Sequence, residues 1–534
     1  MKDAWDPLHD PGSPDLHWST DNVGEAAPGV LTPMCWSLWG AVGDSMPRAI
    51  AYAMGAFSRA EAQAPAPGED RIVHPYFGRI AMRMEYLGTL GDRMPGTTGA
   101  KAVAGLFGRV PETMVFRPTV RRYPIVAVKL PIAFAQAPSR VRRLARETDV
   151  WWRDEVPRLG GRDLSESIAA FGAASRRFDQ ALIVHSLGLL AAVQPLYDAL
   201  AKLVERAGVG DLGALSGSGG AELAIVSDIW RAAQGRVSLD EVIVRHGFHG
   251  PREGEISSRV WREDPSPLLR LLDEYAGRED PMLRDEAARR RLPERQREVL
   301  AALPRARRPA AALVMRMAAD RIPLRGVGKR AFLQALDVAR GTARRAGECL
   351  AAEGTVEDPE DVFYLTADEL TGEIPGDAKD LVARRRERRA EYERLTIPTS
   401  WKGTPAPARI DTQPDASDDD VVTGLGVSAG VVEGTVRIVA DPGFADVEPG
   451  EVLVTPTTDP SWASIMFISS ALVVDIGGAL SHAAVVAREL NIPCVVNTRS
   501  GTRTLRTGDR VRVDGTKGTV EVLERQAAVA GSAT

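Results

Sequence analysis

The sequence DIGGALSHAAVVARELNIPCVV, residues 475–496, is the most informative segment of this chain. A short apolar run ends at Gly477 and Gly478, Ser481 then takes the position of a helix N-cap, and His482 begins the helix. The first turn of a helix offers unpaired backbone N–H groups and the positive end of the helix dipole, which suit an anion and favour a neutral imidazole. The segment therefore predicts either a phosphoryl-carrying His482 or a histidine that only caps the helix.

The sequence around this segment predicts a small domain over residues 421–525. This part is rich in Val, Gly and Thr, and turn residues separate short apolar runs such as EVLVTP, ALVVDI and DRVRVDG. Residues 404–420 precede it, with prolines, small polar residues and a run of aspartates, and predict a flexible linker. We expect residues 526–534 to be a disordered tail. The pattern predicts a compact β-rich domain with at least one helix.

The part of the chain before the linker has a different pattern. Residues 18–403 are mostly of helical type, with apolar residues at helical spacing over 168–204. Residues 1–17 carry several prolines and predict an irregular N-terminal segment. The fold class that follows is multidomain α+β, in which a mainly helical domain precedes the small β-rich one.

Composition excludes several classes of protein. The 534 residues suggest three or more domains as a soft prior, and the net charge of 67 − 72 = −5 argues against a dedicated nucleic-acid-binding protein. The arginine-rich part of residues 287–350 is interrupted by acidic residues and has no interleaved aromatic residues for base stacking, so it predicts a solvated helix face.

The sequence also favours a cytoplasmic protein. The longest strongly apolar run, residues 181–193, is shorter than the roughly 20 residues that a membrane span needs. No basic segment followed by an apolar stretch opens the chain, so we expect no signal peptide. Cys35, Cys349 and Cys494 lie far apart and form neither a metal pair nor a disulfide framework.

Four blocks in the last hundred residues resemble, in order, the swivelling phosphohistidine domain of the phosphoenolpyruvate synthase and pyruvate phosphate dikinase superfamily. The blocks are GLGVSAGVVEGTVRIV (424–439), TTDPSWASIM (457–466), GGALSHAAVVARELNIPCVV (477–496) and GDRVRVDGTKGTVEVL (508–523). The resemblance implies a swivelling β/β/α domain in which His482 accepts a phosphoryl group from a nucleotide and passes it on. It also implies that the residues supporting the phosphohistidine are Ser481, Thr458, Gly477, Gly478 and Arg488. The dikinases often have threonine two residues before the histidine, where this chain has Leu480.

Three further segments are similar to the acceptor-binding domain of rifampicin phosphotransferases. They are WSTDNVGEAAPGVLTPMCWSLWG (18–40), RHGFHGPREGEISSRVWREDP (245–265) and EDPEDVFYLTADEL (357–370). That family has an ATP-grasp domain, an acceptor domain and a phosphohistidine domain, but only 17 residues precede Trp18 here and no GxxxxGK[ST] loop is present. Only 11 residues follow Leu523, too few for the phosphoenolpyruvate barrel of the synthases. The resemblance therefore implies that ATP and Mg²⁺ bind to a separate ATP-grasp subunit, as the two-subunit architecture of phenylphosphate synthases allows.

Candidate acceptor-site residues come from the same segments. His246, His249, Arg252 and Glu253 could meet the phosphohistidine and the acceptor hydroxyl, where a general base is needed, or only hydrogen-bond within a loop. No cysteine accompanies them, so we expect no metal. Further candidates are Met34 and Trp36, which could line an apolar acceptor pocket or belong to the core, together with Arg79. The glycine-rich segment SGSGGAEL, residues 216–223, could be a helix-opening turn or a phosphate cradle.

These observations predict a phosphohistidine-dependent phosphotransferase, or kinase, component of a two-component complex. It would relay a phosphoryl group from ATP on the ATP-grasp subunit through His482 to a hydroxyl of an apolar organic small molecule. We expect no nucleic-acid or membrane partner. Two alternatives stay open: a non-phosphorylating binding or accessory protein, and a scaffold recruited for a reaction on a natural-product intermediate without ATP.

Overall fold

The computed structural model divides the chain into two compact units. The first unit comprises Met1–Ala221, Arg252–Val260 and Glu286–Thr412, and the second comprises Glu222–Pro251, Trp261–Asp285 and Gln413–Thr534. Within these, the structure describes residues 5–21, 23–63, 71–208, 215, 221–277, 280–409, 420–439, 447–448, 450–458, 462–478, 481–490 and 492–526.

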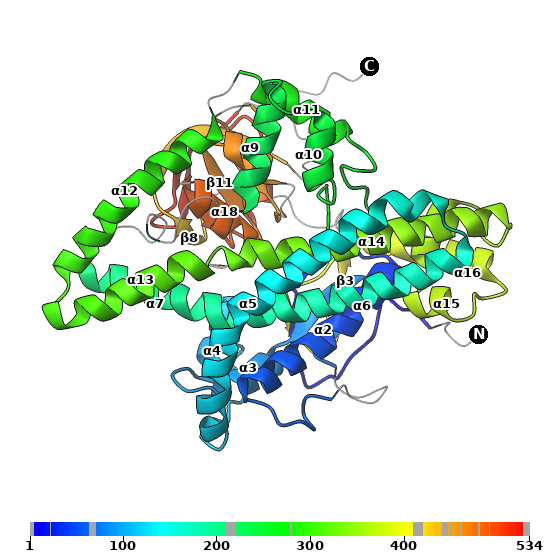
Figure 1. Cartoon of the computed structure of the whole chain (residues 1–534), viewed down its shortest axis with the longest axis horizontal. Coiled ribbons are helices and arrows are strands. Elements are labelled where there is room, and N and C mark those ends of the chain that lie inside the picture. The colour runs from blue at the N-terminus through cyan, green and yellow to red at the C-terminus, as the bar shows by residue number, and fades with distance from the viewer. Residues whose placement is uncertain are drawn as a thin grey trace. The chain divides into compact units, whose positions relative to one another are not determined.

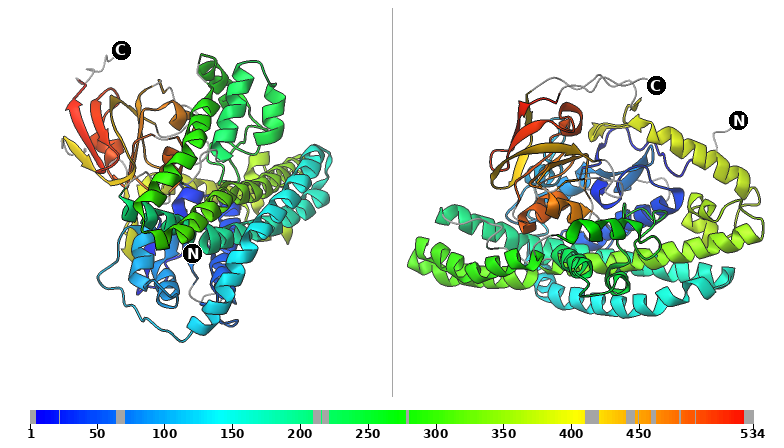
Figure 2. Two further views of the ribbon diagram at one scale, coloured as in Figure 1. Left: turned by 60° about the vertical axis from the view of Figure 1, so that its left-hand side comes forward. Right: turned by 90° about the horizontal axis from the view of Figure 1, so that it is seen from above.

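The first unit is mainly helical, as its sequence pattern predicts. Its longest helices, α5, α6 and α14, run side by side, and α14 packs along both others (Figures 1 and 2). Most of α12 also belongs to this unit. The helices are α1 (Val23–Ala26), α2 (Pro33–Met54), α3 (Met84–Asp92), α4 (Gly99–Phe107), α5 (Tyr123–Glu155), α6 (Leu164–Gly188), α7 (Gln194–Ala207), α12 (Pro281–Ala302), α13 (Arg308–Arg321), α14 (Leu324–Ala352), α15 (Ala367–Thr371) and α16 (Ala378–Glu393).

Local signals in the sequence explain where α6 begins and how it continues. Asp163 and Glu166 form a capping box at its N-terminus, which satisfies two backbone N–H groups. A π-helical segment, Leu189–Val193, then joins α6 to α7. The run Leu164–Ala207 is long and apolar enough to cross a membrane by length and composition alone, a test that the core helices of water-exposed proteins also pass. Here Phe171, Phe178 and Leu182 of α6 are buried inside the unit.

Short strands interrupt the helical region. A four-stranded sheet has the order β2-β3-β1-β5, and a separate pair joins β4 to β6. Part of the predicted linker, residues 404–409, therefore includes a paired strand, while residues 410–419 lie outside the described residues. The strands are β1 (His17–Ser19), β2 (Val73–Tyr76), β3 (Arg79–Arg83), β4 (Leu395–Thr396), β5 (Ser400–Lys402) and β6 (Ala408–Arg409).

The second unit is built on an eight-stranded sheet of the order β7-β14-β13-β9-β10-β11-β12-β8, in which β9 to β12 are parallel neighbours. Side chains alternate between its faces, so Leu453 and Leu472 enter one core and Val452 and Val473 the other. The strands are β7 (Val421–Thr423), β8 (Leu425–Ser428), β9 (Val431–Ile438), β10 (Val452–Thr455), β11 (Ala471–Val474), β12 (Cys494–Val496), β13 (Arg510–Asp514) and β14 (Thr519–Glu524).

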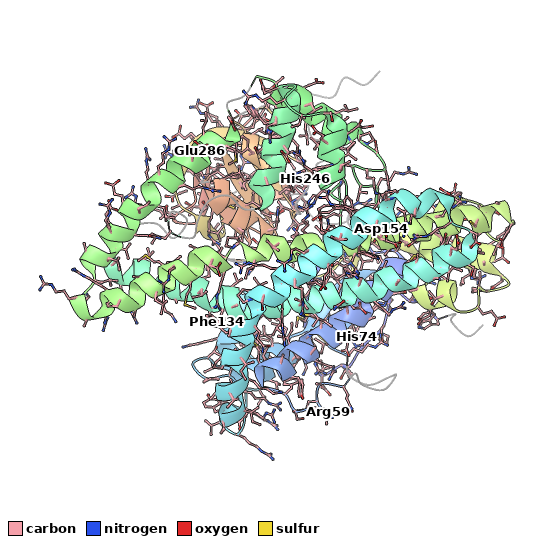
Figure 3. The ribbon with its side chains drawn as sticks, viewed as in Figure 1. Arg59, His74, Phe134, Asp154, His246 and Glu286 are labelled. Atoms are coloured by element: carbon pink, nitrogen blue, oxygen red, sulfur yellow. The ribbon has the colours of Figure 1, made fainter. Side chains whose placement is uncertain are left out.

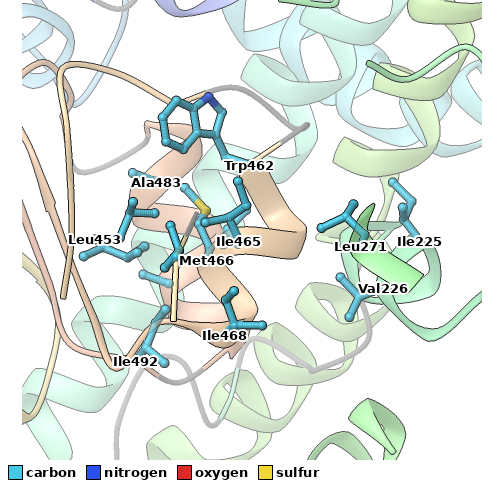
Figure 4. Packing of buried hydrophobic residues seen from close by; sticks show 14 of the residues in the cluster. Ile225, Val226, Leu271, Leu453, Trp462, Ile465, Met466, Ile468, Ala483 and Ile492 are labelled. Atoms are coloured by element: carbon cyan, nitrogen blue, oxygen red, sulfur yellow. The ribbon is translucent and has the colours of Figure 1, made fainter. Parts of the chain in front are cut away.

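Helices from two distant parts of the chain share one core on this sheet. The chain near the sheet supplies α17 (Ala463–Ile468), α18 (His482–Leu490) and α19 (Gly501–Thr504), and the earlier part supplies α9 (Ala221–Ala233), α10 (Leu239–His246) and α11 (Ser266–Tyr275). Ile225 and Leu271 lie in the same hydrophobic cluster as Ile465 and Ile468 (Figure 4). The rings of Tyr275 and Phe467 stack with centroids 6.0 Å apart.

This shared core makes the units differ from the domains that the sequence suggests. The predicted domain of residues 18–403 is continuous, whereas residues 222–251 and 261–285 group with the second unit. The physical reason is that α9 and α11 bury their apolar faces against the helices of the β-rich part, a contact between segments about 200 residues apart in sequence.

Candidate phosphohistidine site

His482 is the first residue of α18 and lies at the end of two neighbouring strands. The parallel strands β10 and β11 end together, with Thr455 paired to Val474. The chain after β10 leads to Thr458 and the chain after β11 leads to His482, so both residues lie beyond the carboxyl ends of the strands, where α/β sheets commonly place their sites. The imidazole Nδ1 of His482 is 3.2 Å from the hydroxyl oxygen of Thr458. Both side chains are buried.

The predicted N-cap is present. The Oγ of Ser481 accepts the N–H of Ala484 at 3.2 Å, and the Ser481 N–H donates to the carbonyl of Gly478 at 3.0 Å. A Cβ atom on Gly477 would lie 3.1 Å from the Ser481 Oγ, closer than ordinary van der Waals contact, so the tight approach of the chain to the helix favours glycine there. These contacts fix where the helix begins and therefore fix the backbone of His482.

Arg488 links helix α18 to strand β8, a role that the sequence did not indicate. Its Nε donates to the carbonyl of Val427 at 2.6 Å, which ties α18 to strand β8. Cys494, on the neighbouring strand β12, is fully buried, and this burial raises the pKa of its thiol to about 12, an effect that Arg488 partly offsets. Cys494 is therefore a core residue rather than a nucleophile at neutral pH.

Asp475 has a structural role that the sequence reasoning missed, although it opens the most informative segment. Its carboxylate accepts the hydroxyl of Thr498 at 2.7 Å and also the hydroxyl and the backbone N–H of Thr502. These contacts hold the loop after β12, in which Asn497 and Arg499 have left-handed backbone conformations. An acidic residue directly after an apolar strand is the signal that could have drawn attention to it.

The acceptor-site candidates His246 and His249 belong to the second unit. His246 ends α10, where Figure 3 labels it, and its Nε2 is 3.0 Å from the Oδ2 of Asp228 on α9. Burial raises the pKa of Asp228, but the hydrogen bonds from His246 and Arg245 outweigh it and leave the pKa below its usual range. The ring of His249 lies between aromatic neighbours, with centroids 4.3 Å from Phe248 and 5.9 Å from Trp261.

The candidates Arg252 and Glu253 belong to the first unit, although they follow closely in sequence. Arg252 has a left-handed backbone with φ 50°, and Glu253 is buried with its carboxylate 3.6 Å from the Nζ of Lys329 on α14. The buried guanidinium of Arg340, also on α14, donates to the carbonyls of Glu253 at 2.9 Å and Glu255 at 3.1 Å. The structure thus divides the four candidates between the two units.

Lys329 belongs to a group of residues that the sequence did not single out. It lies on α14 beside Gly328, where a Cβ atom would come 2.6 Å from the Nδ1 of His185 on α6. Burial, together with the positive charges of Arg325 and Lys329, lowers the pKa of His185 to about 3. The imidazole of His185 is therefore neutral at pH 7, next to two cations.

The remaining candidates have structural partners. Met34 and Trp36 are buried residues of α2, so their packing is that of core residues. Arg79 donates to the carbonyls of Phe77, Tyr392 and Leu395, which ties strand β3 to the end of α16. Among the described residues, no group of three or more His, Cys, Asp or Glu side chains is placed to hold a metal ion. Residues 216–220 of the glycine-rich segment lie outside the described residues.

Two family models match segments that contain several of these residues. Residues 447–518, which include Thr458 and His482, match the mobile domain of PEP-utilising enzymes. Residues 221–330 match the fourth domain of rifampicin phosphotransferase. The mixed α+β fold is therefore confirmed, together with the presence of a mobile domain.

Individual relatives agree with these matches. A rifampicin phosphotransferase of Streptomyces sp. is 34% identical over 301 residues, which are 54% of this chain and 35% of the relative. The rifampicin phosphotransferase of Bacillus subtilis is 32% identical over 181 residues, 34% of this chain and 21% of the relative. An uncharacterized protein of Mycobacterium tuberculosis is 34% identical over 282 residues, 52% of this chain and 30% of its own length.

The chain spans about a third of the length of the Streptomyces and Mycobacterium tuberculosis relatives. In this chain, the segments that match the family models contain His482 at the start of α18 and the loop that follows α10. Over about half of its length the chain is similar to a rifampicin phosphotransferase, and residues 447–518 match the mobile domain of PEP-utilising enzymes.

Proposed function

We propose that this chain is a phosphotransferase component that carries a phosphoryl group on His482 and delivers it to a hydroxyl group. The observation that carries the proposal is the placement of His482 in the first turn of α18, with Nδ1 3.2 Å from the Thr458 hydroxyl, inside a segment that matches the mobile domain. The helix N-terminus favours the negative charge of a phosphoryl group on the ring.

The chemistry consists of two transfers. In the first, a ring nitrogen of His482 attacks phosphorus, and the phosphorus–oxygen bond to the nucleotide breaks. In the second, the acceptor hydroxyl oxygen attacks phosphorus, the nitrogen–phosphorus bond breaks, and the hydroxyl proton goes to a base. Because Thr458 engages Nδ1, we assign the phosphoryl group to Nε2. Transfer of this kind depends mainly on positioning and on charge stabilisation.

We assign the nucleotide to a partner. ATP and Mg²⁺ would bind to a separate ATP-grasp subunit, where the metal clamps the nucleotide phosphates. In support, the segments of this chain that match family models are the mobile domain and the fourth domain of rifampicin phosphotransferase. The mobile domain would move between that subunit and the acceptor, together with α9 and α11, which share its core.

The acceptor that we propose is a hydroxyl of an apolar organic molecule, bound in the cytoplasm. The support is the match of residues 221–330 to a domain of an enzyme named for phosphorylating rifampicin. His246, His249, Arg252 and Glu253 stay candidates for contact with this acceptor, and Lys329 joins them because it pairs with Glu253.

A labelling experiment tests the proposal. The full chain is incubated with ATP labelled at the β-phosphate, alone and with ATP-grasp proteins encoded in the same genome. We expect acid-labile label on this chain only with the correct partner, and none on His482→Ala. The matched control is His9→Ala, a histidine of the first unit, which should label normally. Label that persists in His482→Ala contradicts the proposal. A chain that binds or converts a ligand but is labelled by no partner favours the alternatives of a binding protein or a recruited scaffold.

A further inference from the structure

Three side chains of the first unit form a continuous hydrogen-bonded chain apart from His482. The Nδ1 of His17 lies 2.7 Å from the Oε1 of Glu85, and the Nε2 of His17 lies 2.7 Å from the Oγ1 of Thr113. The residues come from strand β1, from helix α3 and from the loop between α4 and α5. They are far apart in sequence, and the fold alone brings them together.

With an ionised carboxylate and a neutral imidazole, each of these hydrogen bonds has one direction. An ionised carboxylate can only accept, so the Nδ1 of His17 carries the proton that it donates to Glu85. A neutral imidazole then has a lone pair on Nε2, which accepts the hydroxyl proton of Thr113. This is the arrangement of a nucleophile, a general base and an orienting carboxylate.

Secondary structure holds the base and the carboxylate in place. Glu85 lies in the first turn of α3, which favours a negative charge, and its Oε1 also accepts the backbone N–H of His17 at 3.0 Å. His17 is 5% exposed and lies on β1, between β3 and β5. Thr113 is exposed. The imidazole is therefore buried between a partly buried carboxylate and an accessible hydroxyl.

We propose that Thr113, His17 and Glu85 form an acyl-transfer site that hydrolyses small carboxylic esters. The Thr113 oxygen attacks the ester carbonyl carbon while the Nε2 of His17 takes the hydroxyl proton, and the leaving alcohol departs with that proton. Water then attacks the acyl-threonine, His17 takes a proton from the water and returns it to the Thr113 oxygen, and a carboxylic acid leaves. Glu85 stabilises the imidazolium that forms in each step.

The geometry also indicates the substrate class. Thr113 is β-branched, which crowds the attacking oxygen, so a short acyl group fits best. Its exposed position allows the alcohol part of the ester to remain in solvent. p-Nitrophenyl acetate, which has a two-carbon acyl group and a good leaving group, is therefore the probe.

The test uses the full chain and compares the rate of p-nitrophenyl acetate hydrolysis among variants. Thr113→Val removes the hydroxyl but keeps the shape, and we expect the enzyme-dependent rate to fall by about 100-fold or more. We expect a fall of the same size for His17→Gln, which removes the base. Thr113→Ser keeps the hydroxyl and should keep the activity. Glu85→Gln should lower the rate and change its pH profile, because an amide can stabilise the wrong tautomer.

Two further measurements separate a catalytic role from a structural one. After an acid quench, mass spectrometry should find the acetyl group on Thr113, and His482→Ala should hydrolyse the ester at the rate of the unmodified chain. The second result makes this proposal independent of the proposed phosphotransfer. Equal rates for Thr113→Val and the unmodified chain, or acetyl groups only on other residues, would overturn it. Thermal unfolding of each variant identifies those that fail to fold. If a variant fails to fold, the position of the acetyl group in the unmodified chain decides whether the proposal holds.

Discussion

At the scale of single residues, the sequence predicted site residues where their structural partners lie close to them in the chain. Gly477, Ser481 and His482 lie within six residues of one another, so an N-cap and a helix start could be predicted from their order alone. Thr458 was reached through the resemblance, and in the structure its hydroxyl lies 3.2 Å from the Nδ1 of His482. Asp475 and Asp228 were missed because their partners, Thr498 and His246, come from other elements and no local pattern announces them.

The Thr458 hydroxyl should orient the ring of His482. Thr458→Val removes the hydrogen bond to Nδ1 and keeps the side-chain volume, so we expect His482 to be phosphorylated about 5- to 10-fold more slowly, the equivalent of about 1 kcal/mol. Thr458→Ser is the matched control and should stay close to the unmodified rate. The measurement is the initial rate of acid-labile labelling, and an unchanged rate in Thr458→Val would show that the contact has no role in transfer.

His185 should make stability depend on pH. Its pKa is lowered to about 3 in the folded chain, whereas an unfolded histidine titrates near 6.5. The stability that neutral His185 contributes is fully present above about pH 6.5 and is lost as the pH falls towards 3. Between pH 7 and pH 5 the unmodified chain should lose about 2 kcal/mol more than His185→Leu. Urea unfolding at both pH values measures this, and equal losses would contradict it.

At the scale of elements, periodicity predicted the long helices and the β-rich C-terminal part, but it missed the sheet in the first unit. Strands β1 and β5 have three residues each, too few for alternation to show. They pair with each other although nearly 400 residues separate them in the chain. Strand β1 also pairs with β3, which leads into α3, and this places His17 beside Glu85. The periodicity of the sequence could not predict this arrangement.

Arg340 should be an important link between α14 and the loop that contains Glu253. Its fully buried guanidinium donates to the carbonyls of Glu253, Glu255 and Ile256. Arg340→Leu leaves these carbonyls buried without their donor, so we expect a loss of about 3 kcal/mol or more in unfolding free energy. Arg143→Leu, on an exposed surface of α5, is the control and should change stability by less than about 0.5 kcal/mol. Denaturant unfolding compares the two, and similar losses would contradict the assignment.

At the scale of the whole molecule, the sequence could not predict that α9 to α11 group with the β-rich part. The sequence shows that these helices have apolar faces, but it does not show which segment packs against them. In the structure, Leu271 and Tyr275 contribute to the same core as Ile465 and Phe467. The mobile-domain segment of this chain is therefore part of a larger compact unit.

Because this core is shared, removing a side chain from α11 should loosen α17 and α18. Tyr275→Ala removes the fully buried ring that stacks on Phe467, so we expect the second unit to lose about 3 kcal/mol. Hydrogen exchange of the amides in residues 465–488 should accelerate as well. Val244→Ala, at an exposed position of α10, should do neither. Unchanged exchange in Tyr275→Ala would mean that the two segments fold independently.

The most direct test of the central claim is to locate the phosphoryl group on the intact chain. After incubation with ATP, Mg²⁺ and the ATP-grasp partner, tandem mass spectrometry under neutral conditions should find one phosphoryl group on His482. It should disappear when the acceptor alcohol is added, as the phosphorylated alcohol accumulates. A phosphoryl group on any other residue, or phosphorylated alcohol formed at an unchanged rate by His482→Ala, would contradict the account.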